Sequence, residues 1–344
     1  MKHMSHMFVE QKKIIILLFI IFSIPSIFVC AEEEDFSASG YNKQRIEQED
    51  KLLVPIDKVD EVWAFLKDRY VDDKEYLQKI DSLFTSYWNL EEFWDTYYDT
   101  PSLQLLNMKS GVRHRRRINH TDPDDKKSGR ELMQIKLSNI SSNPLDRGEI
   151  KFKIEYPGEI KDPNKYSMLA IVNSSQQEDF KQRLTQLGLD PYSMKPILTV
   201  HDMRSRIYIK RNGNPFMSIS LDRADSQLWW AKISFVEIEP ELNEIAYTDA
   251  DKETQKYMED VLGKIMNEIR VKFPYIERDL TPKYNKSFNK LEGRLPYLKL
   301  LVKANMHNTD GMAIVFLSVI GIICLLGYIS IKKFRTIKFR YNNK

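Results

Sequence analysis

The sequence predicts an α+β body dominated by antiparallel strands, and three features support this fold class. Several short segments alternate apolar and charged side chains, as a strand does when only one of its faces packs on a core. Turn-rich loops separate these segments, for example Asn212-Gly213-Asn214-Pro215. Apolar residues at helical spacing occur only in a few stretches between or beside the strand-like segments.

The first part of the body mixes strand-like and helical signals. The run Glu47-Gln-Glu-Asp-Lys51 leads into the apolar Leu52-Leu53-Val54. Asp57 can cap a helix whose apolar positions extend from Val59 to Tyr70. We expect a second helix within the aromatic-rich stretch 72–95, after which Asp99-Thr100-Pro101 marks a turn.

Beyond that turn the chain is mostly strand-like. The predicted strands are 112–118, 132–138, 149–156, 197–201, 204–210, 216–223 and 233–239. One helix is predicted around 176–187, where Phe180, Leu184 and Leu187 share a face. A longer amphipathic helix is predicted over about 251–270.

The charged faces of these strands are sorted by the type of charge. They comprise Glu47, Glu49 and Lys51; Arg113, Arg115 and Arg117; Gln134 and Lys136; Glu149, Lys151, Lys153 and Glu155; Arg204, Arg206, Tyr208 and Lys210; and Glu237 and Glu239. One account is an open sheet whose charged face is in water. The other is a closed sheet with these faces inward, whose cations would bind a polyanion while its carboxylates bind a divalent ion.

Charge and cysteine content exclude several kinds of function. The net charge is +3, but residues 332–344 carry six basic and no acidic side chains, and residues 32–310 sum to about −5. Bulk nucleic-acid binding, which needs a strongly basic surface, is therefore not expected. The two cysteines, Cys30 and Cys324, lie in apolar segments. The body therefore has no disulfide, cysteine-ligated zinc or thiol nucleophile, and catalysis would need carboxylates, bases or an oxygen-bound metal.

The two ends predict a single-pass type I membrane protein. Residues 1–31 resemble a secretory signal peptide, and the alternative, a retained signal anchor, gives the same orientation. Residues 32–44 form an acidic linker, 291–310 a juxtamembrane segment, 311–331 an uncharged run long enough to cross a membrane, and 332–344 a basic cytosolic tail. The body is therefore expected outside the cytosol, in a lumen, a periplasm or the cell exterior.

Five sequence pieces, in order, resemble the CYTH-type domain of the triphosphate tunnel metalloenzymes, a superfamily that includes the polyphosphate-polymerase (VTC) domain. The pieces are Glu47-x-Glu49-x-Lys51; Tyr97-Tyr98-Asp99-Thr100-Pro101 with Gly111-Val112-Arg113-His114-Arg115; Gln134-Ile135-Lys136; Ser220-Leu221-Asp222 with Phe235-Val236-Glu237-Ile238-Glu239; and Pro282-Lys283-Tyr284. The similarity implies that residues 45–290 form this domain.

The resemblance implies an antiparallel β-barrel that forms a tunnel, and hydrolysis of a triphosphate or polyphosphate with a divalent metal, Mg²⁺ or Mn²⁺. By the same resemblance, the catalytic metal ligands would be Glu47, Glu49, Glu237 and Glu239. The phosphate-binding residues would be Lys51, Arg113, Arg115, Lys136, Lys151, Lys153, Arg204, Arg206 and Lys283. Asp222 is equally consistent with a structural and a catalytic role.

One departure leaves the function open. Lys151 stands where many CYTH proteins have a carboxylate, which favours phosphate binding over full metal occupancy. The alternatives are a membrane-anchored phosphate-binding module without turnover, a polyphosphate polymerase, or a plain structural ectodomain. A location outside the cytosol favours tripolyphosphate, polyphosphate or exported nucleotides as ligands. For Arg113 to Arg117, a solvated patch or an RNA contact remains the alternative to phosphate binding.

Overall fold

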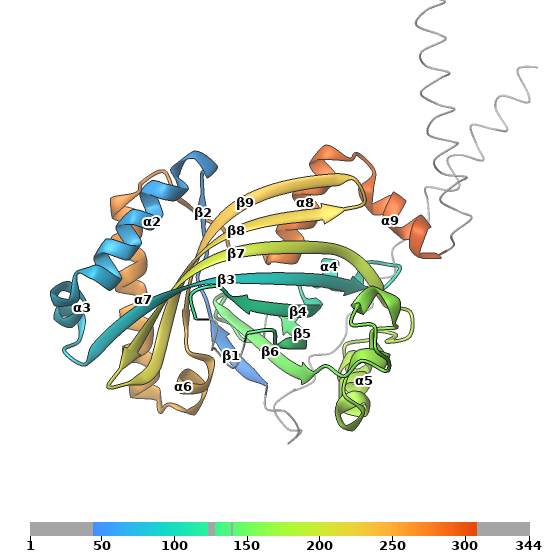
Figure 1. The fold of residues 1–344 in the computed structure, drawn as a ribbon, viewed down its shortest axis with the longest axis horizontal. Helices are drawn as coiled ribbons and strands as arrows, with labels where there is room; N and C mark the ends of the chain where they lie inside the picture. The colour runs from blue at the N-terminus through green and yellow to red at the C-terminus, as the bar shows by residue number, and fades with distance from the viewer. Residues whose placement is uncertain (1–43, 123–127, 139, 308–344) are drawn as a thin grey trace, which may run out of the picture. The chain divides into compact units, whose positions relative to one another are not determined.

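The computed structural model describes residues 44–122, 128–138 and 140–307, which form an antiparallel ten-stranded sheet with flanking helices. The sheet curls into a half-barrel (Figure 1). In sheet order its strands are β1 (Arg45–Gln48), β6 (Asp146–Lys153), β5 (Glu131–Leu137), β4 (Gly111–Asn119), β3 (Phe84–Asp99), β7 (Lys195–Arg211), β8 (Asn214–Leu228), β9 (Ala231–Leu242), β2 (Leu52–Val54) and β10 (Glu277–Arg278). The α+β class and the antiparallel arrangement are confirmed.

The N-terminal segment 45–54 contacts both sides of the half-barrel. Its first part, β1, pairs with β6, and its second part, β2, pairs with β9. Between them, Glu49 forms an isolated bridge with Glu241 of β9, and the Glu49 amide donates a hydrogen bond of 3.2 Å to the carbonyl of Leu145. The glutamates of this segment therefore lie where the two sides approach each other.

Helices cover the apolar face of the sheet, in two separate cores. The helices are α2 (Val59–Lys67), α3 (Lys74–Ile80), α4 (Gln104–Asn107), α5 (Gln177–Gln186), α6 (Glu244–Asp249), α7 (Lys252–Lys272), α8 (Lys283–Arg294) and α9 (Leu298–His307). One core joins α2 and α7 to apolar residues of β7, β8 and β9, such as Ile207 and Ile238. The other joins α5, α8 and α9 to β4, β5 and β6 through residues such as Phe180 and Phe152. Because the apolar faces pack on helices, the charged faces line the concave side.

The second helix expected within 72–95 is confirmed as α3, but half of that stretch belongs to the sixteen-residue strand β3, which was not predicted. β3 pairs along both edges, with β4 and β7, and it buries charged residues such as Glu91 and Asp95, so its sequence lacks a simple apolar alternation. The predicted strands 197–201 and 204–210 are one strand, β7, which continues through the buried Asp202. The helices predicted at 176–187 and 251–270 are confirmed as α5 and α7.

The predicted signal peptide, transmembrane run and cytosolic tail lie outside the described residues. Within the part of the chain that the structure describes, no helix is both long and apolar enough to cross a membrane. Membrane anchoring therefore stays a prediction from the sequence.

Candidate active site

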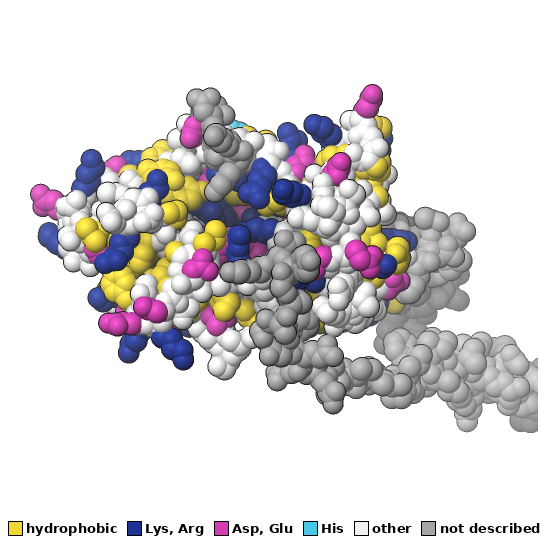
Figure 2. All heavy atoms as spheres, turned by 90° about the horizontal axis from the view of Figure 1, so that it is seen from below, with side chains coloured by type: hydrophobic (Ala, Val, Ile, Leu, Met, Phe, Trp, Pro, Cys, Tyr) yellow, Lys and Arg dark blue, Asp and Glu magenta, His cyan; other side chains and the backbone are white. Residues whose placement is uncertain are grey.

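A pocket on the concave side brings together charged residues from five strands, from the segment between β1 and β2, and from α8. Its charged lining consists of Glu49, Lys51, Lys109, Arg113, Arg115, Lys136, Arg147, Arg204, Glu239, Glu241 and Lys283. Figure 2 shows Lys and Arg side chains gathered around a hollow in this face of the molecule. Cations outnumber carboxylates in this first pocket, so it is suited to an anionic ligand.

Arg113 and Arg115 of β4 are held by one buried carboxylate, Asp95 of β3. Asp95 Oδ2 accepts hydrogen bonds from Arg113 Nη1 at 2.9 Å and Arg115 Nη2 at 2.6 Å, and Oδ1 accepts from Arg115 Nε at 2.7 Å. Burial acts to raise the pKa of Asp95, but the two guanidinium groups outweigh it and lower that pKa. Both arginines therefore stay charged and oriented at the pocket without ligand, which reduces the ordering needed on binding.

Other cations of the first pocket are anchored in the same way. Lys136 of β5 bonds to Glu47 of β1. The Arg147 Nε lies 3.1 Å from Glu49 Oε1, and its Nη2 donates a 2.7 Å hydrogen bond to the carbonyl of Leu280. Each cation thus has a carboxylate neighbour that fixes its direction and keeps it charged.

The carboxylates of the site form two groups. In each group the oxygen atoms of three residues lie within 4.8 Å of one another. The first group is Glu47, Glu49 and Glu241, and the second is Asp222, Glu237 and Glu239. The four predicted metal ligands are therefore divided between the groups, and each group is completed by a residue that was not predicted as a ligand.

The first group fits a divalent metal ion. Carboxylate oxygens are the ligands that Mg²⁺ and Mn²⁺ prefer, and three of them converge here. Burial raises the pKa of Glu241, whereas for Glu47 the Lys136 ammonium outweighs burial and the pKa is lowered. Three ionised carboxylates so close together repel one another unless a cation binds between them.

The second group receives a cation from the protein itself. Lys283, the first residue of α8, places its ammonium among Asp222, Glu237 and Glu239. Lys283 therefore contacts these carboxylates and also lines the first pocket, and its predicted role as a phosphate ligand stays a prediction.

The remaining predicted site residues lie in different places. Lys51 is buried between Glu239 and Glu49, and Arg204 contacts Asp222 and Glu239. Arg206 Nη2 lies 3.2 Å from Glu241. Lys151 bonds to Glu149 and Glu244, and Lys153 is exposed and lines neither pocket.

The prediction missed several residues of the site. Glu241 extends the alternation Glu237-x-Glu239-x-Glu241, and Arg147 extends Arg147-x-Glu149-x-Lys151 to the same face, so both were visible as continued patterns. Asp202 and Lys286 carried no such signal, because the first lies in the middle of a long strand and the second on a helix.

A second pocket continues from the first along the concave side. The two share Arg115 and Glu241, and the second encloses more empty space, about 1240 against 540 Å³. Its charged residues are Arg115, Arg117, Arg130, Lys151, Arg206, Lys210, Glu241 and Glu244. Tyr87 and Tyr208 stack at its wall with ring centroids 5.0 Å apart. The concave side therefore offers a continuous cationic path longer than either pocket alone.

Residues 66–264, more than half of the chain, match the CYTH domain. This chain belongs to the CYTH family. The match leaves out Glu47, Glu49, Lys51 and Lys283; of these, Glu49, Lys51 and Lys283 line the first pocket, and Glu47 lies beside Glu49 in the first carboxylate group. No curated protein sequence matches the chain.

Several solved structures resemble this CYTH chain at low sequence identity. A Pyrococcus horikoshii protein is 17% identical and covers 71% of this chain and 99% of its own, with a TM-score of 0.38. The S. pombe RNA triphosphatase is 10% identical and covers 70% and 85%, with a TM-score of 0.34. The Mimivirus capping enzyme triphosphatase is 10% identical and covers 67% and 91%, with a TM-score of 0.31.

Proposed function

We propose that this CYTH protein is a metal-dependent phosphohydrolase that cleaves phosphoanhydride bonds in triphosphate or polyphosphate chains. The observation that supports this most is the first pocket, where the carboxylates Glu49 and Glu241 line one cavity together with Arg113, Arg115 and Arg147. A ligand between them would contact a carboxylate-bound metal on one side and guanidinium groups on the other. That is the arrangement phosphoryl transfer requires.

Glu47, Glu49 and Glu241 would hold the Mg²⁺ or Mn²⁺ ion. Such an ion, when bound, neutralises phosphate charge and lowers the pKa of a coordinated water. Arg113 and Arg115, fixed by Asp95, would bind non-bridging phosphate oxygens and offset the charge that develops as the bond breaks. Lys136 and Arg147 would orient the neighbouring phosphate from the opposite strands.

The substrate proposed is a linear phosphate chain, and chains longer than triphosphate are included. The second pocket adds cations beyond Arg115 but offers only Glu241 and Glu244 as charged acceptors. A polyphosphate that extends from the first pocket would therefore meet further positive charge. The closed, ligand-binding tunnel expected from the sequence belongs to this proposal.

A binding-only module is the second candidate, and Lys151 is the observation that favours it. Its ammonium lies 2.6 Å from Glu149 and 2.7 Å from Glu244, so a cation engages these carboxylates where a metal would otherwise compete for them. In that case the domain would bind phosphate chains without turnover.

Phosphate release by the full-length protein in mild detergent separates the two candidates. Tripolyphosphate, ATP and long-chain polyphosphate are supplied with Mg²⁺, Mn²⁺ or EDTA. Turnover is expected with metal only, and Glu49→Gln and Glu241→Gln should each reduce kcat by about 100-fold or more, as expected for lost transition-state stabilisation. Glu277→Gln, on the exposed β10, is the matched control and should retain full activity. Binding without metal-dependent release would support the module instead.

We also propose that the protein is anchored by residues 311–331 with its body outside the cytosol, on the basis of the sequence patterns alone. Protease treatment of sealed membrane vesicles tests this orientation. An epitope after Lys344 should be removed while the body stays intact. If the body is digested and the epitope is protected, the orientation is the opposite of the one proposed.

A further inference from the structure

The second carboxylate group is among the most deeply buried charged regions that the structure describes. Asp202, Asp222 and Glu237 have no exposed surface, and Glu239 is 4% exposed. These side chains come from the adjacent strands β7, β8 and β9, where the strand register places Asp222 opposite Glu237. Without cations, carboxylates at this spacing and depth would strongly destabilise the fold.

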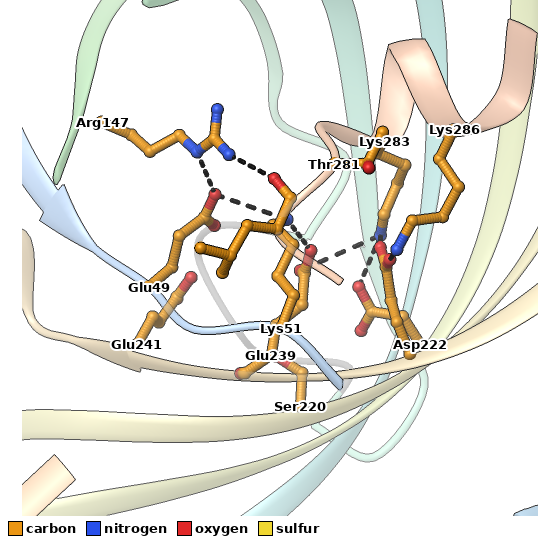
Figure 3. A network of polar contacts seen from close by, with 12 residues as sticks. Glu49, Lys51, Arg147, Ser220, Asp222, Glu239, Glu241, Thr281, Lys283 and Lys286 are labelled. Atoms are coloured by element: carbon orange, nitrogen blue, oxygen red, sulfur yellow. Dashed lines mark hydrogen bonds and ion pairs between the residues drawn. The ribbon is translucent and has the colours of Figure 1, made fainter. Parts of the chain in front are cut away.

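Lys283 lies at the centre of this group. Its Nζ is 2.7 Å from Asp202 Oδ2, 2.6 Å from Asp222 Oδ2, 3.3 Å from Glu237 Oε1 and 3.9 Å from Glu239 Oε2. Figure 3 shows this side chain entering from α8 toward Asp222 and Glu239. The Lys283 ammonium therefore lies among carboxylates that include Glu237 and Glu239, two of the metal ligands expected from the resemblance.

Three further cations complete the neutralisation of the group. Lys286 Nζ lies 2.6 Å from Glu237 Oε2, Arg204 contacts Asp222 and Glu239, and Lys51 contacts Glu239. The chain thus supplies four cations to Asp202, Asp222, Glu237 and Glu239. One of them, the Lys283 ammonium, contacts all four carboxylates, as a bound metal ion would.

The first group differs in geometry. Glu47 pairs with Lys136, Glu49 with Arg147 and Lys51, and Glu241 with Arg206. Within the described part of the chain, none of these cations contacts more than one of the three carboxylates, so only an external cation would bridge them.

We propose that Lys283 is a built-in cation that takes the place of a second metal ion, so that the protein binds one divalent ion, at Glu47, Glu49 and Glu241. The assignment of the divalent ion to the first carboxylate group rests on the proposed function, whereas the assignment of Lys283 to the second group does not. Lys283 is thereby assigned a positioning role, because its contacts with Asp222 and Glu239 also fix Arg204, whose Nη2 bonds to both of these carboxylates.

Removing the lysine should create a metal site. Asp202 Oδ1 and Asp222 Oδ1 are buried without a hydrogen-bond partner, and Asp222 Oδ2 would lose Lys283. A Lys283→Ala variant therefore offers free carboxylate oxygens and the space of an ammonium. A Lys283→Met variant fills that space without charge, and should offer no room for the ion.

Mn²⁺ binding to the full-length protein without substrate tests the proposal, with free Mn²⁺ counted by EPR. Wild type and Asp222→Asn should each bind one ion, Glu241→Gln should bind none, and Lys283→Ala should bind two. Mn²⁺ should raise the melting temperature of Lys283→Ala more than that of Lys283→Met, since only the first gains a site. The measurement on Asp222→Asn tests the proposal even if the Lys283 variants fail to fold.

Two outcomes would overturn the inference. In the first, wild type binds two Mn²⁺ ions and Asp222→Asn binds only one. In the second, Lys283→Ala folds but binds no more Mn²⁺ than wild type does. If wild type binds no Mn²⁺ but Lys283→Ala binds one, the lysine assignment stands and the metal-dependent function proposed for the first group fails. Unchanged Mn²⁺ binding in Glu241→Gln would also contradict the assignment of the single ion to that group.

Discussion

The Tyr284 hydroxyl donates a hydrogen bond of 3.0 Å to Asp99 Oδ2, which joins the first turn of α8 to the end of β3. The Tyr284 ring also stacks on Tyr97, with centroids 5.1 Å apart and planes 8° apart. The same carboxylate accepts the backbone amides of Leu105 and Leu106 at 3.0 and 2.9 Å. Asp99 is therefore a structural residue that holds α4, β3 and α8 together beside the pocket.

A Tyr284→Phe substitution should lower the free energy of unfolding by about 1.5–3 kcal/mol, the usual contribution of a buried hydrogen bond to a charged group. The ring stacking is retained, so the fold should be preserved. Urea unfolding followed by fluorescence measures the change. Tyr192→Phe, at a tyrosine that is 73% exposed, is the matched control. An equal loss in both variants would show that the Asp99 bond contributes nothing.

Acid should selectively remove the contribution of Glu244 to stability. Burial acts to raise the pKa of Glu244, but contacts that include the Lys151 ammonium outweigh it and lower the pKa from 4.5 to about 2. The folded state therefore favours the ionised form, and its contribution is complete above about pH 4.5 and lost as pH falls toward 2. The difference in unfolding free energy between wild type and Glu244→Gln should accordingly be largest at pH 6 and shrink below pH 4.5.

Unfolding curves at pH 6, 5, 4 and 3 measure this difference. Glu178→Gln is the control, because that side chain is 84% exposed in its pair with Lys181. Its difference from wild type should stay near zero at every pH. If the difference in unfolding free energy between wild type and Glu244→Gln stayed constant from pH 6 to 3, the neighbours of Glu244 would not be lowering its pKa.

The second pocket should matter for long chains only. In Arg130→Ala/Lys210→Ala, two cations of that pocket are removed without touching the carboxylate groups. The KM for long-chain polyphosphate should rise about tenfold, since even one lost charge-assisted contact is worth roughly that factor. The kcat/KM for tripolyphosphate should be unchanged.

Lys161→Ala/Lys232→Ala removes the same charge from exposed positions outside both pockets, and is the control for a general loss of positive charge. Equal effects of the two double variants, or an equal loss for both substrates, would exclude a specific role for the second pocket.

Phe180→Ala should be among the most destabilising single substitutions in the domain. The Phe180 ring has no exposed surface and meets Phe152 of β6 edge-on, with centroids 4.8 Å apart. Truncation should cost about 3–5 kcal/mol through lost burial and the cavity left behind. Differential scanning calorimetry measures it, with the half-buried Leu187→Ala as the milder comparison. A similar melting temperature for both would contradict the packing of α5 on the sheet.

The alternating strands were predictable because one of their faces packs on helices. β5 and β6 each show an apolar row, as in Ile135 and Ile150, and β4 keeps Val112 and Ile118 on the face opposite its arginines. β3 was not predictable in this way, because Glu91 and Asp95 are buried by arginines of neighbouring strands. Such pairing depends on strands distant in the sequence, and local pattern does not contain it.

The chemistry of the site could be predicted from the sequence, but not its grouping. Arginines and glutamates were expected on the concave side, yet which glutamates meet depends on register. Residues two apart on β9 are separated by nearly 7 Å along the strand, so the bridge of Glu49 to Glu241 decides that Glu241 joins the first group. The insertion of Lys283 depends on α8, a helix that periodicity did not reveal.

The segment 45–54 also determines when the site can be assembled. It is the first described strand region to be synthesised, but its partners lie near Glu149 on β6 and Ile238 on β9. A growing chain therefore has no complete carboxylate group until β9 has emerged. Such non-local pairing predicts slow folding after synthesis. A chain that ends before β9 would thus carry Arg113, Arg115 and Lys136 but only two of the three carboxylates of the first group, because Glu241 is still missing.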